Sequence, residues 1–257
     1  MLLAIDIGNT NVVCGVYDQG SLKGHWRLAT DWSKTADEYG YLFVGLLQTA
    51  GIRAEQITGA ILSSVVPPLT AAFEQMVETY FRQLPLMVSA DMDTGLTLAY
   101  PNPREIGSDR IVNAAAAYAR YRCALIIVDF GTATTFCTVN QSGEYIGGAI
   151  APGLSIAADA LFSRTAKLPK VDLARPKTVI GKDTVSSIQS GLIFGYAGLV
   201  DELVTRIQVE LGQASRVIAT GGLASLVATE SRTIQEVRPL LTLEGLDLLH
   251  RRTCGET

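Results

Sequence analysis

Two stretches of the chain place an acid and a glycine at the same positions of a strand-turn-strand pattern. "LLAIDIGNTNVVCGVYDQGSLKG" fills residues 2–24 and "LIIVDFGTATTFCTVNQSGEYIG" fills residues 125–147, so a gapless alignment pairs Asp6 with Asp129. The glycine near each acid lets backbone N–H groups approach an anionic phosphate, and a carboxylate beside the phosphate can hold a hydrated Mg²⁺. The repeat therefore predicts two turns that bind one polyphosphate.

The first turn offers the larger set of donors. We expect Asp6 to reach the phosphates through the water shell of Mg²⁺, while the groups that follow it donate hydrogen bonds. The predicted nucleotide-binding residues of this turn are Asp6, Ile7, Gly8, Asn9, Thr10, Asn11, Val12 and Val13. A single DxGxT match also fits an ordinary polar turn, and its repetition favours phosphate binding.

The hydrophobic pattern puts both turns into the same order of elements. Short apolar runs rich in β-branched residues predict strands, and apolar residues three and four apart predict amphipathic helices. In the first half this predicts strands at 2–7, 12–17, 24–30 and 57–67 and helices at 35–51 and 69–84. In the second half it predicts strands at 123–131, 132–140, 144–153 and 215–222 and helices at 155–168, 184–212, from 223 onward and at 243–255.

A repeated β-β-β-α-β-α unit with an acid at its first hairpin resembles the actin-like (ribonuclease H-like) fold of sugar kinases and heat-shock-70 ATPases. The gapless alignment extends the repeat by pairing Cys14 with Cys137. The resemblance implies an α/β protein of two such domains with a nucleotide in the cleft between them. We predict domains at 1–115 and 116–242 and expect the closing helix at 243–255 to return to the first domain.

Composition excludes several classes of partner. With 257 residues, 48% hydrophobic and 18% charged, the chain can bury the cores of two domains. A net charge of −4 and the lack of a basic run argue against nucleic acid and anionic membranes. Asp6 interrupts any signal peptide, and no apolar run approaches the ~20 residues of a spanning helix. We expect a cytoplasmic protein with a small-molecule partner, free cysteine thiols and no metal site built from its two histidines.

Six motifs are spread along almost the whole chain. They are "DIGNTN" (6–11), "SSVVP" (63–67), "YPNPREIGSDR" (100–110), "DFGTATT" (129–135), "GGAIAPG" (147–153) and "ATGGL" (219–223). In this order they resemble the type III pantothenate kinase family. The resemblance implies ATP-dependent phosphorylation of the terminal hydroxyl of pantothenate, the first step of coenzyme A synthesis. It also implies a homodimer that uses Mg²⁺ and a monovalent cation, K⁺ or NH₄⁺.

The resemblance assigns the chemistry to "GSDR". It implies that Asp109 is the catalytic residue and that pantothenate is bound by Tyr100, Gly107, Ser108, Asp109, Arg110 and Thr184. A carboxylate at the start of an Ala-rich helix suits acceptance of the hydroxyl proton, and a guanidinium suits the carboxylate of the substrate. Ser108 or Asp109, and likewise Thr184, fit helix caps equally well, and Tyr100 fits a packing aromatic.

The same family resemblance assigns a different ion to the second turn, which follows Asp129. It implies that Asp129 binds the monovalent cation and that Thr132 donates to the ATP phosphates. A carboxylate with backbone carbonyls around it suits weakly hydrated K⁺, although nothing in the spacing distinguishes K⁺ from Mg²⁺. Gly221 and Gly222 follow a strand, where they fit either a backbone surface for adenosine or a tight turn into a helix.

Two other function classes stay open. Another actin-like phosphotransferase or a phosphatase, such as a sugar kinase or exopolyphosphatase, would share the paired hairpins but not "GSDR" together with "YPNP". A non-enzymatic regulator of gene expression would need a DNA-binding element, and the sequence shows neither a helix-turn-helix pattern nor a basic face.

Overall fold

The computed structural model describes residues 1–255, which form two compact units. The first unit comprises Met1–Gly95, Pro101–Ala116 and the chain from Thr242 onward, and the second comprises Leu96–Tyr100 and Ala117–Leu241. The border falls inside one helix, α3 (Ser108–Tyr121). No helix within residues 1–255 is long and apolar enough to span a membrane.

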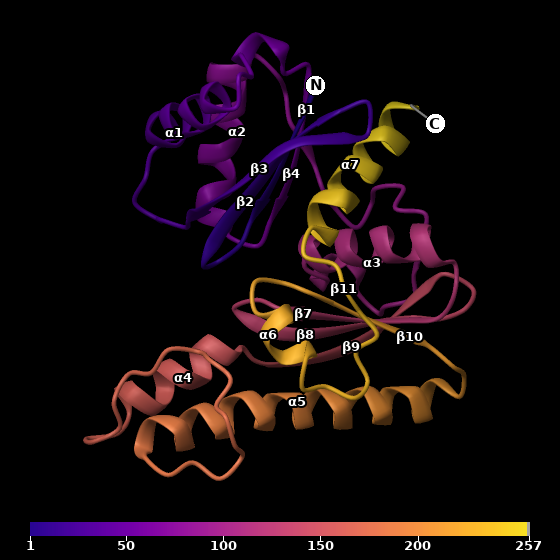
Figure 1. Cartoon of the computed structure of the whole chain (residues 1–257). Helices are drawn as coiled ribbons and strands as arrows, with labels where there is room; N and C mark the ends of the chain where they lie inside the picture. The colour runs from indigo at the N-terminus through magenta and orange to yellow at the C-terminus, as the bar shows by residue number, and fades with distance from the viewer. Residues whose placement is uncertain (256–257) are drawn as a thin grey trace. The chain divides into compact units, whose positions relative to one another are not determined.

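The first unit is built on a five-stranded sheet (Figure 1). Its strands are β1 (Leu2–Ile7), β2 (Asn11–Asp18), β3 (Ser21–Ala29), β4 (Gly59–Ser64) and β5 (Leu86–Met87). Their order in the sheet is β3-β2-β1-β4-β5, with antiparallel pairs β3-β2 and β2-β1 and parallel pairs β1-β4 and β4-β5. Parallel neighbours require crossover connections, and helices supply them here.

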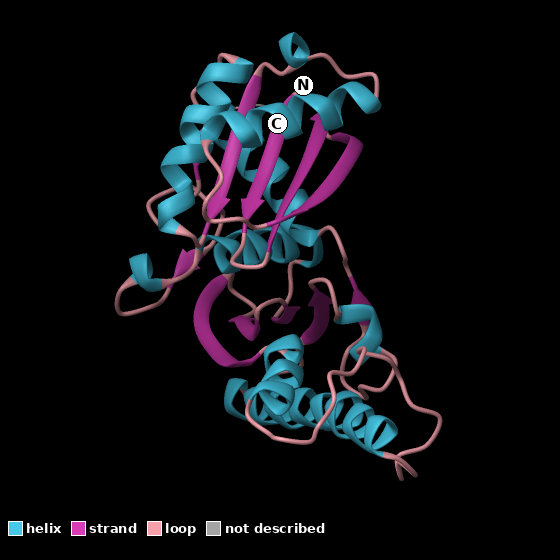
Figure 2. Ribbon diagram, turned by 90° about the vertical axis from the view of Figure 1, so that its left-hand side faces the viewer, coloured by secondary structure: helices cyan, strands magenta, loops and turns pink. Residues whose placement is uncertain are grey.

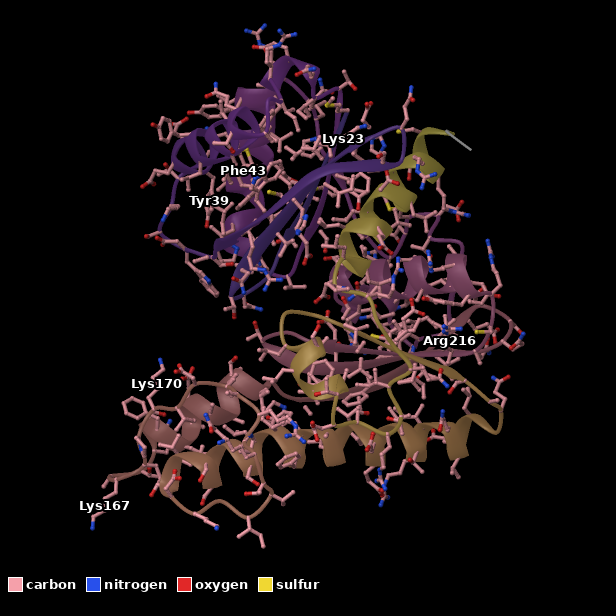
Figure 3. The ribbon with its side chains drawn as sticks, viewed as in Figure 1. Lys23, Tyr39, Phe43, Lys167, Lys170 and Arg216 are labelled. Carbon is pink, nitrogen blue, oxygen red and sulfur yellow. The ribbon has the colours of Figure 1, made fainter. Side chains whose placement is uncertain are left out.

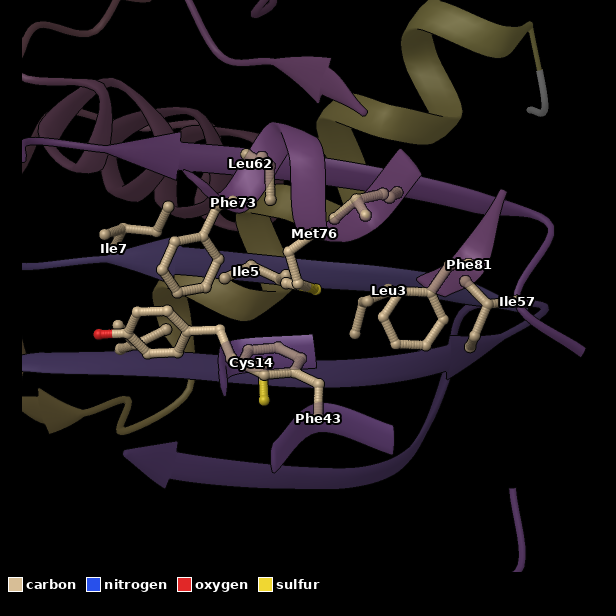
Figure 4. Packing of buried hydrophobic residues seen from close by; sticks show 14 of the residues in the cluster. Leu3, Ile5, Ile7, Cys14, Phe43, Ile57, Leu62, Phe73, Met76 and Phe81 are labelled. Atoms are coloured by element: carbon tan, nitrogen blue, oxygen red, sulfur yellow. The ribbon is translucent and has the colours of Figure 1, made fainter. Parts of the chain in front are cut away.

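Two helices cover one face of this sheet. They are α1 (Ala36–Thr49), between β3 and β4, and α2 (Pro67–Phe81), between β4 and β5; a short 3-10 turn, Ala54–Gln56, precedes β4. Thr35 and Glu38 form a capping box that fixes the start of α1. Tyr39 and Phe43 project from α1 into the core, and Phe73 of α2 packs against both rings (Figures 3 and 4).

Helix α7 (Leu241–Cys254) covers the other face. Cys14 points into the core beneath α1 and α2, so its neighbour Gly15 faces the opposite side of the sheet. There a Cβ added to Gly15 would lie 3.0 Å from Cδ1 of Leu243. The chain from Thr242 onward, which contains the helix predicted at 243–255, belongs to the first unit. Figure 2 shows helices lying against the strands of the first sheet.

The second unit repeats the strand order. Its sheet contains β6 (Thr97–Leu98), β7 (Leu125–Phe130), β8 (Ala133–Val139), β9 (Glu144–Pro152), β10 (Arg216–Thr220) and β11 (Glu236–Val237). The order β9-β8-β7-β10-β11 matches β3-β2-β1-β4-β5 in both sequence and direction. The predicted α/β fold with a duplicated actin-like unit is therefore confirmed.

Helices connect the strands of this second sheet. They are α4 (Leu154–Ser163) and α5 (Thr184–Leu211), between β9 and β10, and the short α6 (Ala224–Ala228), between β10 and β11. Helix α5 packs its apolar side on the sheet and ends at Gly212, which adopts a left-handed conformation with φ 64°. Helix α4 is shorter than the helix predicted at 155–168. The chain leaves the helix at Arg164, ahead of Pro169.

Strand β6 differs from the predicted division of the chain. The sequence-based border at 115/116 assigned residues 96–100 to the first domain, but β6 pairs with β9 and extends the second sheet. A two-residue strand carries too little hydrophobic pattern to reveal its partner.

The two turns predicted to bind phosphate, one after β1 and one after β7, differ in length. Ile7 pairs with Val12 across the first turn and leaves four residues between them, whereas Phe130 pairs with Thr134 across the second and leaves three. The gapless pairing of Cys14 with Cys137 is therefore wrong by one residue. The residue that corresponds to Cys14 is Phe136, and each of these two side chains points into the hydrophobic core of its own unit.

Candidate functional site

The first predicted turn is closed by its own backbone. The N–H of Gly8 donates to the carbonyl oxygen of Asn11 at 3.0 Å, and a Cβ on Gly8 would lie only 3.0 Å from the same oxygen. Thr30, which directly follows β3, donates its N–H to the carbonyl oxygen of Thr10 at 3.0 Å and its hydroxyl to the carbonyl oxygen of Gly8 at 2.6 Å. Asn9 and Thr10 stay exposed at the tip, which leaves this turn accessible to a ligand.

The end of β4 joins the first turn to "GSDR". Strands β1 and β4 run side by side, with Asp6 opposite Ser63. Ser108, the first residue of α3, places its hydroxyl 3.0 Å from the Ser63 hydroxyl, accepts the N–H of Ser64 at 3.0 Å and donates to the Ser64 carbonyl oxygen at 3.0 Å. Three motifs that are far apart in the sequence therefore meet at one edge of the first sheet.

Asp109 sits directly after this anchor. Its Oδ1 accepts the N–H of Arg110 at 2.8 Å, and a Cβ on Gly107 would lie 2.6 Å from the same oxygen. A residue without a Cβ is thus required at position 107 for the Asp109 carboxylate to adopt this position. Burial raises the pKa of Asp109 above the ordinary value of a carboxyl group and outweighs the opposing effect of the Arg110 N–H and charge. A raised pKa brings a carboxylate closer to the range in which a general base works best.

A cavity of about 450 Å³ opens at the start of α3, next to the residues that precede Asp109. It lies at the carboxyl ends of β4 and β5, the edge at which parallel α/β sheets usually bind ligands. Its apolar lining includes Val65, Val88, Ile106 and Ile111, and Gly107 and Ser108 also border it. At its rim Arg104, in the 3-10 turn Pro103–Glu105, pairs with Asp91 at 3.2 Å. The volume is in the range of small-molecule sites.

A second cavity, of about 240 Å³, lies at the opposite ends of these strands. Met1, Tyr17, Asp247 and His250 are among its lining residues. None of the residues predicted for nucleotide or pantothenate borders it, so it carries no part of the candidate site.

In the second unit, glycines crowd Asp129. Gly221, at the end of β10, has φ +92°, and a Cβ there would collide with Oδ1 of Asp129 and with the backbone of Phe130. The N–H of Gly131 donates to the carbonyl oxygen of Ala133 at 3.1 Å and closes the turn that contains half-buried Thr132. The sequence left Gly221 with two possible roles, and its positive φ and its contact with Asp129 now give the reason for glycine at this position.

Tyr100 and Thr184 lie on other elements of the second unit. The ring of Tyr100 packs edge-to-face against Tyr145 at 6.4 Å between centroids. Thr184 is the first, exposed residue of α5, but the cap of this helix is Asp183, whose carboxylate accepts the N–H of Ser186 at 2.8 Å. The alternative of a capping role for Thr184 is therefore wrong.

The capping alternative also fails at the start of α3. The hydroxyl of Ser108 is engaged with β4, and Asp109 lies inside the first turn. The carbonyl oxygen of Gly107 accepts the N–H groups of Arg110 and Ile111. Sequence reasoning assigned no role to Ser63 or Ser64, although a pair of serines at the end of a strand could have indicated a polar anchor.

Comparison with known proteins gives matches over nearly the whole chain. A family model described as "Type III pantothenate kinase" matches residues 2–206. A type III pantothenate kinase of Geobacter sulfurreducens is 56% identical over 252 residues, which cover 98% of this chain and 99% of that one. The corresponding protein of Pelobacter propionicus is 54% identical with the same coverage.

Solved structures support the fold at much lower identity. The ethanolamine utilization protein EutJ from Carboxydothermus hydrogenoformans aligns with a TM-score of 0.58 at 15% identity, over 96% of this chain and 89% of that one. An inorganic polyphosphate/ATP-glucomannokinase from an Arthrobacter species aligns with a TM-score of 0.51 at 15% identity, over 100% and 99% of the two chains. At these identities the likeness concerns the fold alone.

Proposed function

Because the chain belongs to the type III pantothenate kinase family, whose members phosphorylate pantothenate with ATP in coenzyme A synthesis, we propose that Asp109 activates the pantothenate hydroxyl. The observation that carries this proposal is the meeting of three motifs at one sheet edge, through Ser63, Ser64 and Ser108. This edge joins a predicted phosphate-binding turn, a half-buried carboxylate and, beside Ser64 and Ser108, a cavity large enough for a small substrate.

The proposed reaction is a direct phosphoryl transfer. The terminal hydroxyl of pantothenate lies against Asp109, which accepts its proton as the oxygen attacks the γ-phosphorus of ATP and ADP leaves. The close approach that Gly107 permits and the hydrogen bond from Arg110 hold the carboxylate in one orientation. A fixed base at hydrogen-bonding distance supplies the alignment on which phosphoryl transfer depends.

The first turn is the proposed phosphate site. Its exposed tip, at Asn9 and Thr10, and its closed backbone suit donation to anionic oxygens. Asp6 fits Mg²⁺ because it is one half-buried carboxylate at a strand end beside an open turn, and Mg²⁺ prefers few carboxylates and several waters. Bound Mg²⁺ would neutralise charge on the phosphates. The neighbours Ile7, Gly8, Asn11, Val12 and Val13 complete this site in the proposal.

Asp129 is the proposed monovalent cation ligand, and Thr132 the proposed phosphate donor. Asp129 fits a cation site because its carboxylate lies beside the backbone of Gly221, where an added Cβ would collide with Oδ1 of Asp129. Carboxylate and carbonyl oxygens are the ligands that such an ion takes without a strict octahedral shell. K⁺ or NH₄⁺ there would offset negative charge near the phosphates.

Tyr100, Arg110 and Thr184 are the proposed contacts to the rest of pantothenate. Arg110 is half-buried and suits the substrate carboxylate, and the exposed hydroxyl of Thr184 is not required as a helix cap. These roles rest on the family resemblance together with the accessibility of the three side chains. Because it uses ATP, we also propose that the enzyme works in the cytoplasm.

We also propose a homodimer. The second unit exposes large apolar side chains on β9, on α4 and before α5, namely Ile146, Ile150, Ile156, Phe162, Val179 and Ile180. Large apolar side chains that are exposed on a single chain are often buried in an association surface. A second copy of the chain would bury them by two-fold symmetry.

The direct test is phosphorylation of pantothenate by the purified enzyme. ADP release should depend on pantothenate, and mass spectrometry should find phosphopantothenate in K⁺ buffer with Mg-ATP. Glucose and other sugars serve as the control acceptors. Sugar phosphorylation without pantothenate turnover would instead favour another actin-like phosphotransferase.

A further inference from the structure

The segment of α3 that carries Asp109 is held at two points. The first is its start, where Ser108 forms hydrogen bonds with the end of β4. The second lies one turn further along, where α7 crosses it. Figure 1 shows α7 next to α3, and both contact points belong to the first unit. Asp109 lies between the two points.

At the crossing the helix backbones touch. A Cβ added to Gly245 of α7 would lie 2.5 Å from the carbonyl oxygen of Val112 and 2.6 Å from its Cγ1. Beside this contact the hydroxyl of Thr242 donates to Oδ1 of Asn113 at 2.8 Å. Asn113 is only 1% exposed, so loss of the Thr242 hydroxyl would leave this buried acceptor without that donor.

Helix α7 is itself held against the first sheet by buried side chains and by an ion pair. Leu243 packs against Gly15 in the sheet, and Leu246 and Leu249 are fully buried. Near the other end Arg252 pairs with Asp93 at 2.8 Å. A helix fixed along the sheet in this way can act as a rigid reference for α3. The match to the family model ends at residue 206, so α7 lies outside the matched segment.

We propose that Thr242 and Asn113 are positioning residues for Asp109. Residues 109 and 113 are four apart on α3 and therefore lie on the same side of the helix. The Thr242–Asn113 hydrogen bond fixes the rotation of α3 about its own axis and its distance from α7. Gly245 allows the two helices to approach closely enough to form this bond. A displacement of about 1 Å at a reacting group can reduce the rate by about 100-fold. The inference rests on the proposed role of Asp109.

Thr242→Val tests the hydrogen bond with almost no change of shape. We expect kcat with pantothenate to fall about 10-fold, within the range that misplacement can cause, while KM for ATP stays within about twofold. Thr242→Ser, which restores the hydroxyl, should restore kcat. The matched control is Thr253→Val on the same helix, since the Thr253 hydroxyl donates only to Leu249 of α7 in its described contact and should be neutral. Equal kcat values for Thr242→Val and Thr253→Val would overturn the proposal.

A second arm separates positioning from general loss of structure. In the Asp109→Asn background, adding Thr242→Val should change the residual rate by less than about twofold, because the residue to be positioned has lost its function. A further 10-fold loss there would show that Thr242 acts by another route. If Asp109→Asn alone keeps the wild-type rate, the proposed role of Asp109 fails first. Should Thr242→Val not fold, Thr242→Ala replaces it with the same expectations.

Discussion

At the residue scale, the half-buried carboxylate of Asp109 is held in a nearly fixed orientation by the N–H of Arg110. Asp109→Asn keeps the shape but cannot accept a proton, so turnover should fall by roughly two to four orders of magnitude, the usual scale for loss of a general base. A coupled assay of ADP release measures turnover, and titration measures ATP affinity, which should change little. Asp91→Asn, an exposed acid at the rim of the same cavity, is the control. Near-normal turnover of Asp109→Asn would refute the role.

The cation dependence also belongs to single residues. The enzyme should be active in K⁺ or NH₄⁺ buffer and nearly inactive in Na⁺ or a bulky organic cation, because only a large, weakly hydrated ion suits carboxylate and carbonyl ligands without octahedral geometry. Asp129→Ala should lose most activity and its cation dependence. Initial rates after exhaustive buffer exchange check this. A full wild-type rate in the bulky cation would reduce Asp129 to a structural acid.

Individual residues show where sequence reasoning stopped. The motif "GSDR" predicted the start of a helix with a carboxylate that could accept a proton. In the structure Asp109 lies in the first turn of α3. The sequence could not decide whether Thr184 caps its helix, because Asp183 and Thr184 are both good caps and the backbone conformation selects between them. It also could not show that Gly221 touches Asp129, since that contact joins strands distant in the chain.

At the scale of elements, a buried carboxylate on α5 holds the segment before β11. Asp201 is 4% exposed and accepts hydrogen bonds from Ser231, Arg232 and Thr233. Burial opposes ionisation, but these bonds together outweigh it and lower the pKa of Asp201 to about 2. The folded pKa is below the unfolded value of about 3.9, so this stabilisation is present above pH 4 and is lost as the pH falls toward 2.

Asp201→Asn should therefore lower the free energy of unfolding by about 2 kcal/mol at pH 7, and the difference from wild type should shrink between pH 4 and pH 2. Urea unfolding followed by circular dichroism at several pH values measures both. Asp159→Asn, an exposed acid 3.9 Å from Lys170, is the control and should change stability little at any pH. A difference that does not vary with pH would contradict this account.

The repeated strands explain what could be predicted of the fold. Alternating apolar residues specify strands, and two copies of one pattern specify the same sheet order twice. Both copies even shift register at the corresponding place, between Val16 and Tyr17 in β2 and between Thr138 and Val139 in β8. Turn length was not predictable because glycine, threonine and asparagine fit turns of three or of four residues. The gapless alignment of the two halves is therefore wrong by one residue after the turn.

At the scale of the whole molecule, the chain of 27.5 kDa should sediment as a dimer of twice that mass at micromolar concentration. Ile180→Asp places a charge on the exposed apolar surface of the second unit and should favour the monomer. Leu84→Asp, an equally exposed apolar position in the first unit, is the matched control and should leave the mass unchanged. A wild-type monomer in analytical ultracentrifugation would exclude the dimer.

The return of α7 to the first sheet also orders events during synthesis on the ribosome. The second unit ends at Leu241, so all of its strands have been translated before α7 is complete. One face of the first sheet, by contrast, stays uncovered until α7 has been made and Leu243 can cover Gly15. Domains that are complete early tend to fold during translation. The sheet that is made first is thus completed only after the second unit, and nascent chains should expose this face to chaperones until α7 has been made.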